Sequence, residues 1–233
     1  MSRAIRNDFD QRLQRAWLAR GPMAWALLPV AALFGAIGAL RRALYAGGWC
    51  QAQTLPVPVI VVGNLVVGGA GKTPTVMAIV RLLRRHGRVP GIISRGHGRR
   101  GSACLEVRAG MRASECGDEP LLLHRRSGAP VVVGRDRVAA ARRLLARHPQ
   151  VNVIVSDDGL QHLRLARTAQ VLVFDERGVG NGWLLPAGPL REPFACTVPT
   201  RSVVLYNAPA ATTRWPGSVA QRSLAGVVPL AAW

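Results

Sequence analysis

A glycine-rich segment around the chain's only lysine is the first candidate for chemistry. It reads GNLVVGGAGKTP over residues 63–74. Glycines let backbone N–H groups turn toward phosphate oxygens, and a helix that follows adds the partial positive charge of its N-terminus. Lys72 would reach the β- and γ-phosphates of a nucleotide, while the Thr73 hydroxyl would bind Mg²⁺. The segment predicts a phosphate-binding loop for ATP, whose contacts would be Gly68, Gly69, Ala70, Gly71, Lys72, Thr73 and Pro74.

This loop departs from the strict pattern G-x-x-x-x-G-K-[ST] at one position. The pattern asks for glycine where the chain has Val66, and the additional glycines stand later, at 68 and 69. The alternative is a glycine-rich turn without a ligand. Every other basic residue of Lys or Arg type, out of 31, is arginine. A lone lysine at this position favours the G-G-x-G-K-T variant of the loop. Such a loop needs the compact ammonium group of lysine instead of the planar guanidinium group of arginine.

Carboxylates form the second group of candidates. Of the 12 acidic residues, several stand in adjacent pairs, at 118–119, 157–158 and 175–176. Scarce carboxylates placed side by side suggest metal binding or acid–base catalysis, against the alternative of chance and helix-start charge. Asp157 and Asp158 follow an apolar run at 151–155 as in a Walker B element, so one of them is predicted to hold Mg²⁺. An aspartate that caps a turn is the alternative.

Asp118 lies in the tetrapeptide Gly-Asp-Glu-Pro, beside Glu119. As a general base it could take the proton from an attacking hydroxyl group. An aspartate before Glu-Pro is equally suited to be a helix N-cap. The residues alone leave both interpretations open.

Four polar side chains near these carboxylates are further candidates. Gln161 and His162 follow the aspartate pair closely and could contact substrate or phosphate, although a lone histidine is more often structural. Arg135 and Arg137 could clamp a phosphate in bidentate fashion. Solvated charge at a helix start is the alternative for both arginines.

The elements that must position these residues alternate along the chain. Apolar, β-branched runs predict strands at 57–62, 89–94, 131–133, 151–155, 171–174 and 203–205. Helical patterns lie at 73–86, 119–126 and 137–147. Such alternation predicts an α/β fold of the P-loop NTPase type, with a mostly parallel, doubly wound sheet and helices on both faces. In such sheets ligands bind at the carboxyl ends of the strands, where each candidate motif stands.

An uncharged N-terminal segment at 21–40 precedes this core. Twenty such residues can just span a bilayer, yet Pro29 interrupts them. The three interpretations are a membrane span, a helix lying in the interface with Trp17 and Trp25 as anchors, and a buried core helix. A cleaved signal peptide is not expected, because the charged leader is long and the phosphate loop requires cytosolic nucleotide.

Composition narrows the class of partner. The formal net charge of +19 indicates an anionic partner, or a general arginine bias of the source. Nucleic acid is not expected, since aromatic residues make up only 5% and no zinc-finger spacing, RNP motif or recognition helix is present. None of the 4 cysteines forms C-x-x-C, so they predict small buried side chains in a reduced cytosol. The sequence does not identify protein partners.

Taken together, these residues resemble the lipid A 4'-kinase family. The resemblance rests on GNLVVGGAGKTP (63–74), ISRGHG (93–98), GDEP (117–120), VVVGRDR (131–137), SDDGLQH (156–162) and FDERGVGNGWLLPAGPLREP (174–193). These stretches follow one another in the family's order. The last two are far more specific than the phosphate loop.

The resemblance implies transfer of the ATP γ-phosphate to the 4'-hydroxyl of a tetraacylated glucosamine disaccharide 1-phosphate in lipid A synthesis. It places the chain on the cytosolic face of the bacterial inner membrane, peripheral or with a single span. By the same resemblance Asp118 is the catalytic base, Lys72 and Thr73 serve nucleotide and Mg²⁺, and Asp157-Asp158 serve the metal. The same cleft would be lined by Glu119, Arg95, Arg135, Arg137, Gln161 and His162.

Two departures from the family accompany this resemblance. His97 stands where an aromatic residue is usual, and the second lobe with its Pro-Asp-His-His-type motif is not found. We therefore expect a membrane-associating helix at 1–45, a kinase core at 46–200 and the start of a truncated second lobe at 201–233. An inactive, membrane-associated nucleotide-binding fragment is the alternative function. A GTPase or metallochaperone of the same loop class is not expected, because a chain with one lysine cannot carry the guanine-reading Asn-Lys-x-Asp.

Overall fold

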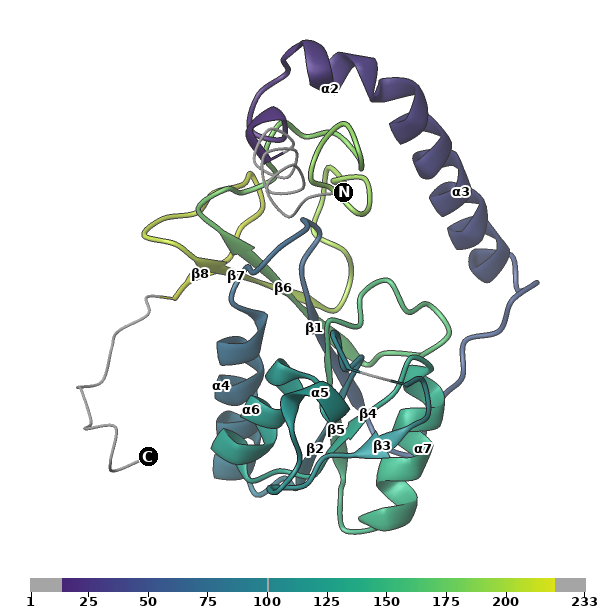
Figure 1. Ribbon diagram of the computed structural model, residues 1–233, viewed down its shortest axis with the longest axis vertical. Coiled ribbons are helices and arrows are strands. Elements are labelled where there is room, and N and C mark those ends of the chain that lie inside the picture. The colour runs from purple at the N-terminus through teal and green to yellow at the C-terminus, as the bar shows by residue number, and fades with distance from the viewer. Residues whose placement is uncertain (1–13, 100, 221–233) are drawn as a thin grey trace.

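The computed structural model describes residues 14–99 and 101–220, and its elements alternate as the sequence predicts (Figure 1). The helices are α2 (Pro22–Ala26), α3 (Leu28–Ala46), α4 (Lys72–Arg85), α5 (Ala113–Cys116), α6 (Asp118–Ser127) and α7 (Arg137–Arg147). The strands are β1 (Val59–Gly63), β2 (Pro90–Ser94), β3 (Leu105–Glu106), β4 (Val131–Val133), β5 (Val153–Asp157), β6 (Ala169–Asp175), β7 (Ser202–Asn207) and β8 (Ser218–Val219).

All of these strands join one 8-stranded sheet in the order β3-β4-β2-β5-β1-β6-β7-β8. Every pairing is parallel except that of β3 with β4. The predicted parallel, doubly wound α/β fold is confirmed, while the short elements β3, α5 and β8 were not predicted. Because β1 lies between β5 and β6, the loops that follow these three strands meet at one edge of the sheet.

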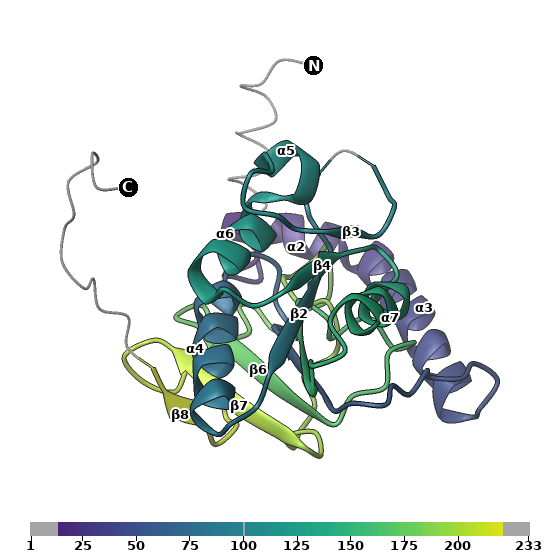
Figure 2. The same cartoon turned by 90° about the horizontal axis from the view of Figure 1, so that it is seen from below.

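Alternation along the strands divides the core into two layers. Val61 belongs to the cluster that α7 completes with Val138 and Leu144, whereas the next residue, Val62, belongs to the cluster around Val76 of α4. Successive side chains of a strand point to opposite faces, so a continuous apolar run buries both faces at once. Figure 2 shows the result, with α4 and α6 on one side of the sheet and α7 on the other.

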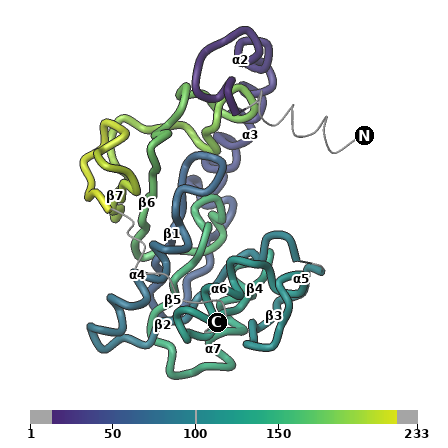
Figure 3. The backbone as a smooth tube through the Cα atoms, turned by 60° about the vertical axis from the view of Figure 1, so that its left-hand side comes forward, coloured from purple at the N-terminus to yellow at the C-terminus, as the bar shows by residue number. Residues whose placement is uncertain are grey.

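The N-terminal apolar segment forms two helices that meet at Leu27. Pro29 lies in the first turn of α3, where a residue without an N–H group does no harm. α3 continues past Arg41 and Arg42, so the charge-free run 21–40 does not mark its bounds. In Figure 3 α2 and α3 lie at the end of the molecule where β1 and β6 terminate.

The described part of the 201–233 segment extends the first lobe. β7 pairs with β6 over six residue pairs, and β8 pairs with β7 in the same sheet. The physical reason is the apolar character of residues 203–205, which continue the sheet edge beside β6. Residues 221–233 lie outside the described residues, so the second lobe stays a prediction.

Candidate active site

The phosphate loop leaves β1 and enters α4 with its lysine already held in place. Lys72 Nζ donates to Asn64 Oδ1 at 3.1 Å and to the Gly68 carbonyl at 3.3 Å. Asn64 is fully buried and its amide group also donates to Gly68 O at 3.2 Å. Gly71 precedes α4 at φ +83°, a conformation that favours glycine. The loop thus has the shape and the charge to receive phosphate oxygens.

Asp157 ends β5 directly beside this loop. Its side chain is 1% exposed, and Oδ2 accepts a hydrogen bond from Ser94 Oγ at 3.0 Å. Burial raises the pKa of this carboxyl group to about 6, and Glu119 adds to the rise. Among the described residues Asp157 Oδ1 has no hydrogen-bond partner. A buried carboxylate oxygen left without a partner at a strand end fits a hard cation.

The magnesium ion would need ligands from more than the protein. Within residues 14–99 and 101–220 no three His, Cys, Asp or Glu side chains come together in a way that could hold a metal. Mg²⁺ usually keeps several waters and binds through one or two carboxylates plus substrate phosphates. Asp157 and Asp158 line the same cleft as Lys72 and therefore fit Mg²⁺ that arrives with a nucleotide, whereas Thr73 as a ligand stays a prediction.

Asp158 connects the aspartate pair to both of its neighbours. Its Oδ1 lies 3.8 Å from Lys72 Nζ and accepts from Arg191 Nη1 at 3.1 Å. The residue has φ +47°, uncommon outside glycine, and strain of this kind clusters at functional sites. Arg191 also contacts Gln161 Oε1 at 3.4 Å, and Gln161 donates to Glu192 at 2.9 Å. A series of polar and charged side chains thus connects Lys72 of the phosphate loop to Glu192.

Asp118 begins α6 and faces the cleft. The N-cap of α6 is Gly117, at φ +96°, and no side chain caps the helix. The N-cap interpretation of Asp118 is therefore wrong. Asp118 and Glu119 are exposed and line the same cleft as Lys72. The carboxylate is thus available to a ligand, as a general base requires.

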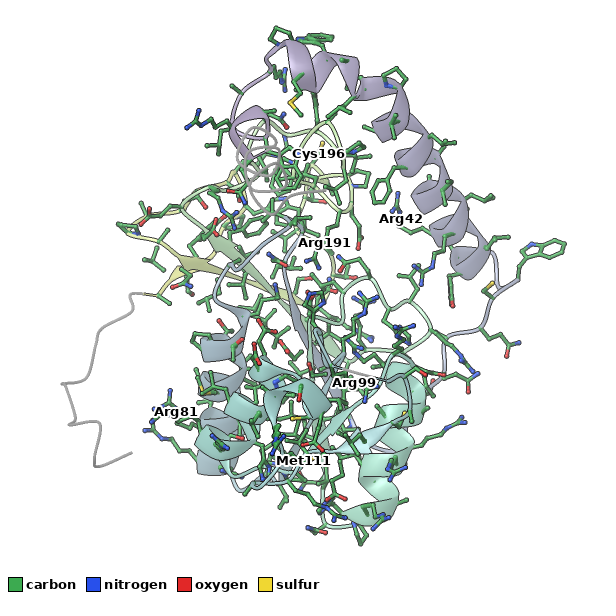
Figure 4. All side chains as sticks on the ribbon, in the orientation of Figure 1. Arg42, Arg81, Arg99, Met111, Arg191 and Cys196 are labelled. Carbon is green, nitrogen blue, oxygen red and sulfur yellow. The ribbon has the colours of Figure 1, made fainter. Side chains whose placement is uncertain are left out.

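One cleft of about 820 Å³ collects these groups. The predicted residues Gly68, Gly69, Lys72, Arg95, Asp118, Glu119, Asp157, Asp158 and Gln161 line it. α3 forms the other wall with Phe34, Ile37, Gly38, Arg41 and Arg42. Figure 4 labels Arg42 on α3 and Arg191 near the carboxyl end of β1, and both line the cleft.

Several predicted residues lie behind the cleft instead of lining it. Arg137 is 3% exposed and donates to the carbonyl groups of Gly134, Asp157 and Asp158. Burial lowers the pKa of its guanidinium to about 10. This geometry makes Arg137 a support of the aspartate turn, because its Nη1 and Nη2 groups donate to backbone carbonyls.

His162, Arg135 and part of the phosphate loop are also outside the lining. His162 Nε2 lies 3.8 Å from Asp136, which caps α7 through the backbone N–H groups of Val138 and Ala139. Burial lowers the pKa of His162. Arg135 is exposed and not among the lining residues. Ala70 and Gly71 precede α4, Thr73 and Pro74 lie in its first turn, and these four residues are also outside the lining.

The site contains residues that sequence reasoning did not single out. Asn64, Ser94 and Arg191 hold the lysine and the two aspartates, and Arg41 and Arg42 come from the apolar segment. Asn64, Ser94 and Arg191 lie in the motif stretches used for the resemblance, so that signal was available. Nothing in the sequence pattern signals that α3 closes the cleft.

The third acidic pair does not join this cleft. Asp175 accepts from the Arg177 guanidinium at 2.7 Å, and Glu176 is exposed. Both residues line a separate depression beside Gly69 and Asn207. Metal binding or acid–base catalysis therefore stays a prediction only for the pairs at 118–119 and 157–158.

α3 has the length and composition of a membrane-spanning helix. Its 19 residues have a mean hydropathy of 1.3, and 6% of them are buried. Leu33, Ile37 and Leu40 are each more than 60% exposed. Within the described residues α3 is therefore not a buried core helix, one of the three interpretations.

Comparison with known proteins agrees with this geometry. A family model described as tetraacyldisaccharide-1-P 4'-kinase matches residues 23–227. The chain is 59% identical to a tetraacyldisaccharide 4'-kinase of Leptothrix cholodnii over 222 residues, covering 95% of the chain and 64% of the relative. It is 57% identical to the Methylibium petroleiphilum protein of the same name, covering 98% of the chain and 64% of the relative.

A solved structure shows the same fold. The crystal structure of LpxK from Aquifex aeolicus in complex with ATP superposes with a TM-score of 0.67 at 34% sequence identity. The match covers 78% of the chain and 58% of that protein. The chain therefore spans less than two thirds of the length of each of these relatives.

Proposed function

Because the chain belongs to the tetraacyldisaccharide-1-P 4'-kinase family, we propose that its cleft transfers the γ-phosphate of ATP to a lipid-linked sugar. The acceptor would be the 4'-hydroxyl of a tetraacylated glucosamine disaccharide 1-phosphate. Its acyl chains would require an apolar surface next to a phosphoryl-transfer site. The observation that carries the proposal is that α3 and the phosphate loop line one cleft.

The residues of the cleft divide the chemistry among them. Lys72 would bind the β- and γ-phosphates, and Thr73 with Asp157 and Asp158 would hold Mg²⁺. When bound, Mg²⁺ neutralises charge on the phosphate oxygens. Asp118 would accept the proton of the attacking hydroxyl group as it adds to the γ-phosphorus and the bond to the ADP oxygen breaks. Arg191 would stay paired with Asp158 and hold that side chain in place.

The membrane surface is the proposed partner of α3. An exposed apolar helix that carries Arg41 and Arg42 in its C-terminal part suits the interface of a bilayer with anionic headgroups, either across it or lying on it. We propose the cytosolic face of the bacterial inner membrane, because the phosphate loop uses cytosolic nucleotide. Residues 1–45 would then be the membrane-associating segment and 46–200 the kinase core, whose sheet β7 and β8 of the 201–233 segment extend. No nucleic-acid partner enters this proposal.

The test is a kinase assay in detergent micelles with labelled ATP and the tetraacyl disaccharide 1-phosphate. Labelled product that disappears in Lys72→Ala would support the proposal. ATP binding without product would support the second candidate, a nucleotide-binding piece of a longer enzyme, which the 64% coverage of its relatives favours. No ATP binding at all would overturn both.

A further inference from the structure

The run after β6 is one of the two most specific motifs of the sequence, yet apart from Arg191 it has no role in the proposed chemistry. Its residue Asn181 is 7% exposed and lies in the loop 179–190. The Asn181 amide Nδ2 donates to the carbonyl oxygens of Ala16 at 3.0 Å and Ala187 at 2.9 Å, with Ala19 at 3.4 Å. Its Oδ1 accepts from the Trp183 N–H group at 3.0 Å. One buried side chain thus ties its own loop to the segment that precedes α2.

Backbone and ring contacts strengthen the same junction. The Asn181 N–H group donates to Trp17 O at 2.7 Å, and Trp17 Nε1 donates to Pro186 O at 2.9 Å. Arg20 donates to Asn181 O at 3.2 Å, and its guanidinium lies 5.2 Å from the centre of the Trp183 ring. Trp25 of α2 meets Trp183 edge-on at 4.9 Å. The segment 14–27 is therefore held by several independent interactions.

The glycines of the loop permit this close approach. A Cβ on Gly180, at φ +58°, would lie 2.6 Å from Trp17 O. A Cβ on Gly188 would lie 2.2 Å from Asn181 Oδ1. Both positions require the absence of a side chain, so the loop is shaped around the N-terminal segment.

The same loop also contacts the phosphate loop and α3. Val67 N–H donates to Pro189 O at 2.9 Å, and Arg191 N–H donates to Leu65 O at 2.7 Å. Leu184 fits against Gly35 of α3, where a Cβ would lie 2.7 Å from its Cδ1. α3 itself makes few contacts with the core, since 6% of it is buried. The loop is the described segment that joins both walls of the cleft.

We propose that Asn181 is a positioning residue, which fixes the N-terminal segment and α3 over the phosphate loop. Its role is to set where an acceptor lipid meets the nucleotide, without touching either. The part of the inference that concerns the acceptor rests on the proposed function, whereas the anchoring of α3 does not. An alanine at 181 would take this donor from the buried carbonyl group of residue 187 and from the part-buried carbonyl group of residue 16, which should weaken the junction.

The test is hydrogen–deuterium exchange of the chain in mild detergent, with Asn181→Ala against Asn152→Ala. The Asn152 side chain also accepts one backbone hydrogen bond, from Val89 N–H at 2.8 Å. This bond lies at the amino ends of β2 and β5, away from the cleft. We expect exchange at 14–27 to be about tenfold faster in Asn181→Ala, with unchanged rates in β1 and α4 and ATP affinity within about twofold. Asn152→Ala should leave the exchange of 14–27 unchanged.

Two outcomes would overturn the inference: unchanged exchange at 14–27, or an equal acceleration in β1 and α4, which would mean a merely structural role. If Asn181→Ala does not fold, Trp17→Phe removes the Nε1 donor and keeps an aromatic ring, and a smaller acceleration confined to 14–27 is expected. In the kinase assay Asn181→Ala should raise KM for the acceptor about tenfold and leave KM for ATP within about twofold. A chain without turnover would weaken the proposed function, yet exchange would still decide the anchoring.

Discussion

The two walls of the cleft are built in opposite ways. The nucleotide wall consists of buried polar groups on the carboxyl ends of neighbouring strands, and Lys72, Asn64 and Asp157 are each less than 10% exposed. The α3 wall is a single helix whose apolar side chains face outward, with Leu33, Ile37 and Leu40 each more than 60% exposed. Hydrogen bonds hold the first wall, and one loop and a few ring contacts hold the second.

The difference follows from the surroundings that each wall requires. Buried polar groups must find partners inside the protein, so their positions are strongly determined by the sheet. An apolar helix in water lacks such a partner and is completed only by another apolar phase. We expect changes in the nucleotide wall to act on chemistry and nucleotide binding, and changes in α3 to act on membrane binding.

The largest effect should come from Asp118→Asn, which removes the proposed base and keeps the shape of its side chain. General bases contribute roughly 10²–10⁴-fold to rate, so turnover should fall by that order while ATP affinity stays within about twofold. Turnover in micelles and equilibrium ATP binding measure the two quantities. Equal loss of both would assign Asp118 to nucleotide binding instead.

The pH dependence of stability should reveal Asp157. Burial raises the pKa of its carboxyl group from 3.8 to about 6, so the folded, metal-free chain binds a proton there that the unfolded chain has released. This stabilisation is complete below pH 3.8 and is lost as pH rises through about 6. It amounts to about 3 kcal/mol, at about 1.4 kcal/mol for each pKa unit.

Denaturant unfolding of the metal-free chain between pH 4 and pH 7 measures the free energy of unfolding. In Asp157→Asn the part of its pH dependence that comes from this carboxyl group should be absent. Binding of Mg-ATP should respond in the opposite sense, because the ligand that we propose is the deprotonated carboxylate. Its affinity is expected to rise as pH increases through about 6. A stability profile identical in wild type and Asp157→Asn would exclude this carboxyl group as the source.

Ile37→Glu tests the α3 wall. Burying a large apolar side chain contributes roughly 1.5–3 kcal/mol, so affinity for anionic vesicles should fall about tenfold or more. The stability of the core should change by less than about 0.5 kcal/mol, since the site is exposed. Leu82→Glu, at a leucine of α4 that is 53% exposed, is the matched control and should leave vesicle flotation unchanged.

The smallest effect is expected for Asn64→Ala. Lys72 keeps the Gly68 carbonyl but loses Asn64 Oδ1, a hydrogen bond of the order of 1 kcal/mol. ATP affinity should therefore fall about fivefold, with vesicle binding unaffected. Isothermal titration with ATP measures the first quantity. A loss of vesicle binding in this variant would show that the two walls are not independent.

The sequence determined the fold class and the positions of the chemical motifs. Apolar runs of β-branched residues with glycine or aspartate at their ends predicted the parallel strands, and the lone Lys72 marked the phosphate loop. These features are local, because a buried strand and a tight turn each place their demands on adjacent residues. Lys72, Asp118, Asp157 and Asp158 were all predicted, and the structure brings them to one cleft.

Tertiary structure alone decided which charged side chains reach that cleft. Arg137 and His162 are near the motifs in sequence, yet the first turns inward to backbone carbonyls and the second toward Asp136. The sequence also predicted an apolar N-terminal helix, but it did not predict where this helix lies in the folded molecule. That place depends on contacts across more than 160 residues, between Asn181 and Ala16. No local pattern records such a contact, because it forms only when distant segments meet on the folded sheet.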